Sequence, residues 1–243
     1  MADSNFNLIF KRVEKKYLLQ DEVYEKFLQR IAPYMHMDEH GLHTICNIYY
    51  DTEHFDLVRT SIEKPSYKEK LRLRSYGIPG ENDDVFLELK KKYKGTVYKR
   101  RISMKLKEAE NYLKHGIMPN RKSQILNEID YFLHFYNPVG KVYLAYDRIA
   151  YIGNEDPDFR LTIDQNIRSR DYDLDLKKGD FGNPLLNHSE YLLEIKTLAA
   201  LPLWLVEILS ELKIYPVSFS KYGNIYKNEI TTTRRKETCL QVS

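Results

Sequence analysis

The stretch EKLRLRSYG, residues 69–77, alternates two kinds of side chain along its length. Leu71 and Leu73 occupy one parity, whereas Arg72 and Arg74 occupy the other. Successive side chains of a β-strand point to opposite faces of the sheet, so this segment predicts a strand with one apolar face and one guanidinium face. The guanidinium face is either solvated or part of a surface that holds an anion.

The length and the charge balance of the chain limit its class. With 243 residues, it is long enough for a sizeable core and fits a single barrel or α+β domain. We expect one domain over residues 1–243, with a core spanning about residues 10–228 and a mobile polar tail over 229–243. The net charge is only +3, from 38 basic and 35 acidic residues, so no nucleic-acid partner is expected. An anion site must therefore come from local segregation of charge.

Cysteine usage and hydropathy indicate the compartment. The two cysteines, Cys46 and Cys239, are too few for a disulfide framework. Cys46 stands in an apolar strand, which favours a small buried residue over a nucleophile. The N-terminus lacks the apolar core of a signal peptide, and no apolar run approaches the length of a membrane span. These features predict a cytoplasmic location and no membrane segment.

Most of the chain has the pattern of β-strands. Stretches with period-two alternation begin at residues 10, 46, 70, 84, 96, 141, 159, 190 and 215, and turn signals separate them. Helical periodicity appears after Asp21 and within residues 107–116, 122–136 and 201–213. Many strands with few helices, in no regular βαβ order, predict an α+β fold: an antiparallel β-barrel with helices packed outside.

Other strands segregate charge in the same way. In each of these strands two polar residues stand two positions apart and so point to the same face: Glu14 and Lys16, Glu88 and Lys90, Lys99 and Arg101, Tyr146 and Arg148, and Glu194 and Lys196. Taken singly, each polar face is most simply a solvated one. However, these faces consist mainly of Arg, Lys and Glu, and the apolar helices need the opposite face to pack on. A charged bore would be costly when empty, but it suits a polyanion and a divalent metal.

The motifs, taken in order, resemble a known family. Arg-x-Glu-x-Lys-Tyr from Arg12 is followed by IYYDT, LRLRSYG, LELK, VYKRR, YDR, RLTID, LLEIK and FSKY. This order resembles the VTC domain, the polyphosphate-polymerase branch of the CYTH or triphosphate tunnel metalloenzyme superfamily. The resemblance runs from about Arg12 to Tyr226. It implies a barrel whose basic tunnel binds ATP or another triphosphate and polyphosphate, and transfers the ATP γ-phosphate to a growing chain with Mn²⁺ or Mg²⁺.

The resemblance also implies roles for individual residues. The catalytic set would be Arg72, Arg74, Lys90, Arg148, Arg160 and Glu194. Further phosphate contacts would come from Lys16, Lys99, Tyr146, Ser220 and Lys221. The metal would be held by Glu194, with Glu14 and Glu88 as further acidic positions at the tunnel ends. Strand parity selects the same residues, except that Ser220 and Lys221 rest on the resemblance alone.

The sequence leaves several functions open. The hydrolytic members of the superfamily begin with Glu-x-Glu-x-Lys, whereas Arg12 replaces the first glutamate here, which fits the polymerase branch better. A metal-dependent triphosphatase, a nucleotide cyclase and a non-catalytic polyphosphate-binding module fit the same motifs. The neighbouring His36, His40 and His43 match no standard zinc spacing and are expected to be exposed loop residues. Arg100 is expected to point away from the charged face.

Overall fold

The computed structural model describes residues 13–198 and 200–230. The strands are β1 (Val13–Gln20), β2 (Met35–Met37), β3 (His43–Asp51), β4 (Tyr67–Tyr76), β5 (Asp84–Tyr93), β6 (Thr96–Lys105), β7 (Val139–Gly153), β8 (Arg160–Arg170), β9 (Asn183–Pro184) and β10 (Glu190–Thr197). The helices are α1 (Asp21–Ile31), α2 (Asp56–Ile62), α3 (Leu106–His115), α4 (Gln124–Tyr136), α5 (Leu203–Glu211) and α6 (Lys221–Ile225), with a 3₁₀ turn η1 (Leu176–Lys178) and a π-helical turn η2 (Tyr226–Ile230). Arg12, Cys239 and residues 231–243 lie outside the described residues.

The strands form one curled antiparallel sheet, which confirms the predicted fold class. Its order is β1-β10-β8-β7-β3-β4-β5-β6, with β2 attached to β7 and β9 to β8. In the described part of the chain no ladder joins the end strands β1 and β6, so the predicted barrel is not closed by backbone hydrogen bonds. The Glu14 carboxylate of β1 and the Lys90 ammonium of β5 approach to 3.9 Å across the gap.

The chain after α5 covers the free edge of β1. Val217 N donates a hydrogen bond to Lys16 O at 2.7 Å, and Pro216 forms an isolated bridge with Tyr17. A later segment thus satisfies part of an edge that would otherwise be unpaired. The predicted strand starting at residue 215 is therefore wrong beyond this bridge, because the chain turns into α6 at Lys221.

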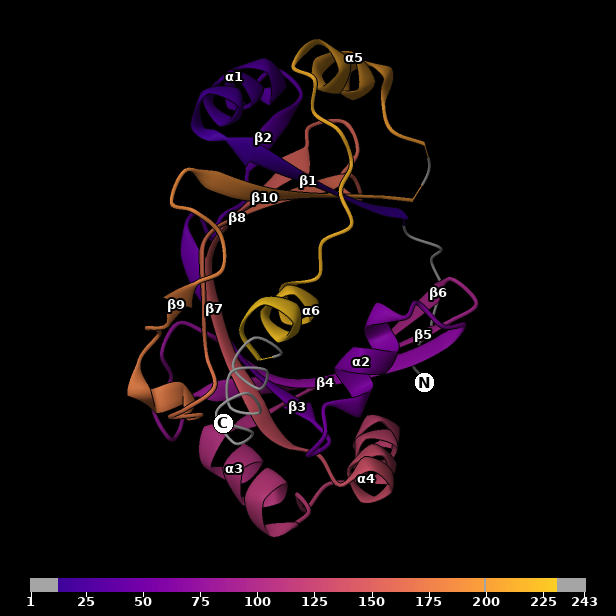
Figure 1. Ribbon diagram of the computed structural model, residues 1–243, viewed down its shortest axis with the longest axis vertical. Helices are drawn as coiled ribbons and strands as arrows, with labels where there is room; N and C mark the ends of the chain where they lie inside the picture. Colours follow the sequence, from indigo (N-terminus) through magenta and orange to yellow (C-terminus); the bar gives the residue numbers. More distant parts are fainter. Residues whose placement is uncertain (1–12, 199, 231–243) are drawn as a thin grey trace, which may run out of the picture.

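The apolar face of the sheet carries two outer cores. Leu71, Leu73 and Leu89 pack with Ile129 and Phe132 of α4 in the first. The second joins β1, β8 and β10 to α1 and α5. Figure 1 shows α1 with α5 at one end of the molecule and α3 with α4 at the other. These helices thus lie outside the curled sheet, as predicted. No helix of the described residues is long and apolar enough to span a bilayer.

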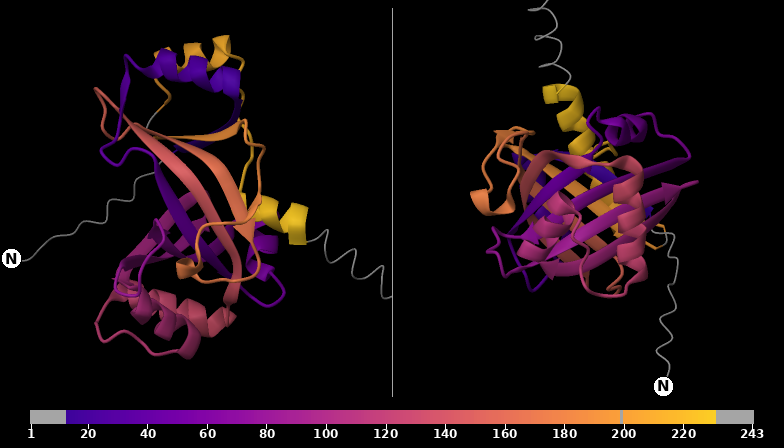
Figure 2. Two further views of the ribbon diagram at one scale, coloured as in Figure 1. Left: turned by 90° about the vertical axis from the view of Figure 1, so that its left-hand side faces the viewer. Right: turned by 90° about the horizontal axis from the view of Figure 1, so that it is seen from below.

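A third core lies on the concave side and was not predicted. Tyr222 and Ile225 of α6 and Val58 of α2 pack against Tyr49 and Leu144 of the sheet. The two helices lie side by side in both views of Figure 2. Helix α2 has only seven residues, too few for a clear periodic pattern, and α6 has five. These helices cover one part of the concave face, and the charged residues occupy the part beside them.

Asp51 connects both inner helices. Its Oδ1 accepts hydrogen bonds from the backbone N of Thr52 and Leu57, at 2.8 and 2.9 Å. Its Oδ2 accepts from Val58 N at 3.0 Å and from the Tyr222 hydroxyl at 2.8 Å. Asp51 is fully buried. Its carboxylate satisfies N–H groups in the first turn of α2 and at the same time anchors α6 through Tyr222.

We expect Asp51→Ala to lower the free energy of unfolding by about 3 kcal/mol, because several buried donors lose their acceptor at once. Asp56→Ala is the matched control at the same helix end, since its side chain is more than half exposed. It should cost less than about 1 kcal/mol. Urea denaturation measures both changes, and equal losses would contradict the anchoring role of Asp51.

Candidate functional site

The charged residues of the concave face form a continuous cluster, which we call the basic lumen. Its cations are Lys16, Lys70, Arg72, Arg74, Lys90, Lys99, Arg101, Arg148, Lys196 and Lys221, and its carboxylates are Glu14, Glu88, Asp164 and Glu194. They come from β1, β4, β5, β6, β7, β8, β10 and α6. Cations clearly outnumber carboxylates, so the face as a whole attracts anions.

Glu88 organises one side of the basic lumen. Its Oε2 lies 2.6 Å from Arg72 Nη2 and 3.8 Å from Arg74 Nε, and its Oε1 lies 2.9 Å from Lys99 Nζ and 3.0 Å from Arg101 Nε. Burial alone would raise the pKa of Glu88, but Arg72, Arg74 and Lys99 hold it well below its usual range. A carboxylate in contact with four cations keeps them together, and a metal at this position would have to compete with all four.

Two tyrosines accept hydrogen bonds from the arginines of β4. Arg72 Nη1 donates to the Tyr49 hydroxyl at 3.1 Å, and Arg74 Nη2 donates to the Tyr146 hydroxyl at 2.9 Å. Arg148 Cζ and Lys221 Nζ lie 5.1 and 4.4 Å from the centroid of the Tyr146 ring. Tyr146 therefore links Arg74 of β4 to Arg148 of β7 and Lys221 of α6.

The pKa of Tyr49 reflects this surrounding charge. Burial alone would raise the pKa, but Arg72, Lys70 and Arg74 outweigh burial and lower it to about 8. Burial would also raise the pKa of Tyr146, but Arg74, Arg148 and Lys221 lower it below its ordinary value. Both phenols thus report a strongly positive local potential.

Asp164 pairs with the cations on the opposite side. Arg148 forms a bidentate pair with it, with Nε···Oδ1 at 2.6 Å and Nη2···Oδ2 at 2.8 Å. Lys221 of α6 contacts the same carboxylate. Asp164 is fully buried; burial would raise its pKa, but Arg148 and Lys221 hold it far below the usual range. Asp164 thereby positions two of the predicted phosphate ligands.

Glu194 and Glu14 flank Lys16 near the free edge of the sheet. Lys16 Nζ lies 3.6 Å from Glu194 and 3.3 Å from Glu14, and it donates to Phe219 O at 3.1 Å. Lys196 Nζ reaches Glu194 at 2.5 Å. Burial alone would lower the pKa of Lys16, but Glu194 and Glu14 outweigh it and raise the pKa. Burial would raise the pKa of Glu194, yet Lys196, Lys16 and Lys221 keep it well below its usual value.

The donor set near Glu194 suits a divalent metal only in part. Among the described residues, no three His, Cys, Asp or Glu side chains gather as a metal site. The predicted ligand Glu88 is already in contact with four cations. Glu194 has the buried Thr162 hydroxyl opposite it in the β8–β10 register, and Thr162 Oγ1 has no hydrogen-bond partner there. Glu194, Glu14 and this hydroxyl fit a cation that also takes phosphate oxygens as ligands.

Most of the predicted site residues converge in the basic lumen. Ser220 accepts a hydrogen bond from Lys70 Nζ at 3.2 Å and caps α6 through Gly223 N. Arg160 stands opposite the lumen residue Lys196 in the β8–β10 register and shares the parity of Thr162, but its side chain is exposed at the start of β8. There its Nε donates only a long hydrogen bond, 3.4 Å, to Pro157 O. Arg160 is thus at the rim, and its phosphate role stays a prediction.

Some lumen residues were not predicted as site residues. Lys70 shares the parity of Arg72 and Arg74, and Asp164 shares that of Arg160, so alternation could have identified both. Asn47, whose Oδ1 accepts from Arg74 Nε at 2.9 Å, and Tyr49 also share one parity, on β3. The predicted outward direction of Arg100 is confirmed, since it pairs with Glu128 of α4.

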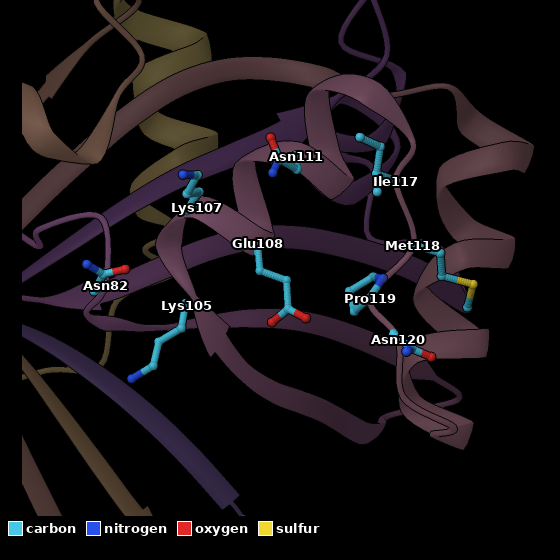
Figure 3. A pocket seen from close by; sticks show the side chains of 9 residues that line it. All are labelled: Asn82, Lys105, Lys107, Glu108, Asn111, Ile117, Met118, Pro119 and Asn120. Atoms are coloured by element: carbon cyan, nitrogen blue, oxygen red, sulfur yellow. The ribbon is translucent and has the colours of Figure 1, made fainter.

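A separate surface pocket lies beside α3 and carries a different chemistry. Its lining combines Ile117, Met118 and Pro119 with Lys105 and Glu108 (Figure 3). Glu108 is already paired with Arg121. Lys107 and three asparagines also line this pocket, but it contains none of the arginines of the basic lumen and is a separate surface feature.

The remaining predictions from the sequence concern histidine and cysteine. Among the described residues the histidines near residue 40 form no metal group. However, His36 belongs to the three-residue strand β2 and His43 begins the nine-residue strand β3, so the predicted loop is wrong at these two positions. Cys46 is fully buried, as expected.

Comparison with known proteins identifies the fold. The chain is similar to a candidate adenylate cyclase from Bacillus halodurans, with 17% identity over 86% of this chain and 93% of the other, at a TM-score of 0.55. It is also similar to a Hippeastrum protein, a candidate adenylyl cyclase described as having a dominant triphosphatase activity. There the identity is 18% over 89% of this chain and 95% of the other, at a TM-score of 0.52. A search of curated proteins found no match.

The curled antiparallel sheet of this chain thus has the fold of these two solved structures. The sequence model of the VTC domain matches residues 11–229, nearly the whole chain. The chain therefore belongs to the VTC domain family, as its motif order predicted.

We expect Glu88→Gln to destabilise the protein by about 3 kcal/mol, because buried cations lose the carboxylate between them. This value is the lower end of the range for buried pairs, since Lys99 and Arg101 are partly exposed. Added tripolyphosphate should raise the melting temperature of Glu88→Gln more than that of the wild type, because an anion replaces the lost charge.

Glu128→Gln provides the control on the outer face, where Glu128 pairs with Arg100 and Lys91. Tripolyphosphate should stabilise this variant no more than the wild type. If both variants respond alike to the anion, the role assigned to Glu88 is wrong.

The lumen carboxylates also predict an acid-sensitive fold. The folded-state pKa values of Glu88, Asp164 and Glu194 lie below their ordinary values of about 4. Their stabilisation is therefore complete above about pH 5 and is lost as the pH falls further. Burial raises the pKa of Asp51, which acts in the opposite direction but is a single group.

Urea denaturation at pH 7, 5, 4 and 3 measures this loss. The free energy of unfolding should change little down to about pH 5 and then fall steeply. The fall should be shallower in Glu88→Gln, since one titrating group is absent. A free energy that stays constant to pH 3 would contradict the assigned pKa directions.

Proposed function

We propose that this protein is a metal-dependent phosphotransferase that moves the γ-phosphate of ATP onto a polyphosphate chain in the basic lumen. Its membership of the VTC domain family supports the proposal. The observation that carries it is the convergence of Arg72, Arg74 and Arg148 around Tyr49 and Tyr146, in a lumen where cations outnumber carboxylates. Such a face is complementary to a ligand with several negative charges.

The arginines supply the directional contacts to the phosphates. Their planar groups can each donate two parallel hydrogen bonds to phosphate oxygens. Arg74 is fixed by Asn47 and Tyr146, and Arg148 by Asp164, so both lose little freedom when substrate binds. Lys99 and Lys221 add charge from the two sides. This arrangement stabilises the negative charge on the equatorial oxygens during transfer.

Acid–base chemistry plays a small part in the proposed reaction. The acceptor is the ionised end of a phosphate chain, so it needs positioning more than deprotonation. Tyr49 and Tyr146 accept from the arginines and keep their own O–H groups available to donate to phosphate oxygens. The proposal includes no contact to the nucleotide base, so base selectivity should be weak.

A divalent ion, Mn²⁺ or Mg²⁺, completes the proposed site. Glu194, with Glu14 and the Thr162 hydroxyl, would hold it together with phosphate oxygens, and the ion would neutralise phosphate charge. Lys16 and Lys196 already contact Glu194, so they compete with the metal and keep the carboxylate ionised in its absence. A cytoplasmic location, where ATP and Mg²⁺ are present, belongs to the same proposal.

Triphosphate hydrolysis is the second candidate. The same contacts serve this reaction if water takes the place of the acceptor, and the similar Hippeastrum protein is described with a triphosphatase activity. Nucleotide cyclisation and binding without turnover would use the same phosphate contacts. Incubation with ATP and Mn²⁺ separates these functions, because the products are polyphosphate, orthophosphate, a cyclic nucleotide or none.

We expect Arg72→Ala and Glu194→Gln each to reduce polyphosphate synthesis by about 100-fold or more, since each removes a charge that acts on the transferred group. Arg72→Ala should also weaken tripolyphosphate binding in the absence of metal. Synthesis is followed by gel electrophoresis of the products, and phosphate release is measured in parallel.

Arg100→Ala is the matched control, because it removes one arginine from β6 on the outer face. It should retain synthesis within about twofold once folding is verified by its melting curve. Full activity in Arg72→Ala and Glu194→Gln would refute the roles given to them. Release of orthophosphate without chains in the wild type would favour the triphosphatase.

A further inference from the structure

A row of lysines continues the basic lumen along β4 and β5. Lys70 and Lys68 follow Arg72 on the same face of β4, toward the end of the strand at Tyr67. In the register of the sheet, Lys70 stands opposite Lys90 and Lys68 stands opposite Lys92. We call these four residues the lysine track. Like charges directly opposite each other are unfavourable in an antiparallel pair, so two successive pairs require an explanation.

The lysine track has little neutralising charge. Within residues 13–198 and 200–230, the only ion pair that its members form is the long one between Lys90 and Glu14, at 3.9 Å. Lys91, between two track residues on the opposite face of β5, instead pairs with both Glu69 and Glu128. On β5, the outward-facing Lys91 is thus neutralised by carboxylates, whereas the track lysines on the inner face have no close carboxylate among the described residues.

Backbone and hydroxyl groups hold two of the track ammoniums in place. Lys68 Nζ donates to Ser61 O of α2 at 3.0 Å, and Lys70 Nζ donates to Ser220 Oγ at 3.2 Å. These partners are uncharged, so they orient the lysines without cancelling their charge. An anion that lies over β4 and β5 would meet ammonium groups already held in place, Lys68 by α2 and Lys70 by Ser220 at the start of α6.

Burial, together with repulsion among the track lysines, lowers the pKa of Lys70 and of Lys68. Burial lowers the pKa of Lys70 to about 8, and the charges of Lys90, Lys68 and Lys16 contribute to this shift. Burial and the neighbouring Lys92, Lys64 and Lys90 lower the pKa of Lys68 as well. A bound anion would relieve this repulsion and would favour the charged form of each lysine.

The geometry points to the lysine track as a binding site for the part of a linear polyphosphate chain that extends beyond the lumen. From Arg74 to Lys68 the strand advances about 20 Å, at about 3.3 Å per residue, which is more than three linked phosphates can span. The inference rests on the proposed function, because it assumes that phosphates occupy the lumen. It adds a chain-length preference, which triphosphate binding alone does not require.

An inorganic chain fits this track better than a nucleic acid does. The track is a narrow strip of two cross-strand lysine pairs continuous with the arginines, and it matches a ligand that carries charge on every unit without a base or sugar. The overall charge of +3 does not favour a duplex as the ligand. Single-stranded DNA is therefore the competing polyanion that the experiment must include.

The experiment measures the binding of three probes to the full chain by calorimetry: tripolyphosphate, a linear polyphosphate of about 100 units, and a single-stranded DNA oligonucleotide. The test variant is Lys68→Ala with Lys92→Ala, which changes only the outer half of the track. The charge-matched control is Lys105→Ala with Lys107→Ala, both exposed and outside the track. Melting curves verify that each variant is folded.

We expect the test variant to bind the long polyphosphate about tenfold more weakly, a loss of about 1.4 kcal/mol. Its affinity for tripolyphosphate should stay within about twofold of wild type, and the control should leave both affinities unchanged. The salt dependence of long-chain binding should also become shallower, since fewer ammonium–phosphate contacts remain.

The opposite outcomes separate the two proposals. If the wild type binds tripolyphosphate and long polyphosphate equally well, or if the test variant weakens both equally, the lysine track is not a chain site although the proposed function stands. A loss confined to DNA binding would also overturn the inference. If the wild type binds neither phosphate probe, the proposed function itself fails.

Discussion

The repulsion among cations on one concave face is the constraint on which the rest of the structure depends. Guanidinium and ammonium groups from many strands lie close together there, and carboxylates must balance part of their charge in the curled sheet. Glu88 and Asp164 provide this balance from within, each buried and each in contact with several cations. Because the lumen carboxylates do not match the cations in number, a positive excess remains for a ligand.

The two faces of the sheet divide the tasks of folding and binding. The leucines of β4 and β5 are covered by α3 and α4, so stability comes mainly from the outer cores. The inner face can then carry charge without having to supply the core. Helices α2 and α6 cover only part of it, and Asp51 holds both in place. Lys221 and Ser220 thereby reach the lumen from a helix that Asp51 anchors beside it.

Strand alternation predicted the direction of single side chains but not which of them meet. Arg72 points into the lumen and Arg100 out of it, as period-two parity requires. The cations around Glu88 come from β4 and β6, on either side of its own strand, so their meeting depends on register and curl. Glu88, which the resemblance places at a metal, is found in contact with four cations, and its role as a metal ligand stays a prediction. Helix α6 was missed because its position follows from the contact of Tyr222 with the distant Asp51, and such short elements carry little local signal.

An anion in the lumen would act as a structural part of this protein as well as a substrate. The fold holds neighbouring cations together at a cost in stability that a bound phosphate chain would reduce. The cost falls mostly on the residues that face the ligand, because the outer Lys91 is neutralised by two carboxylates whereas the track lysines are not. This difference between the two faces of β5 is what the proposed polyanionic ligand would require.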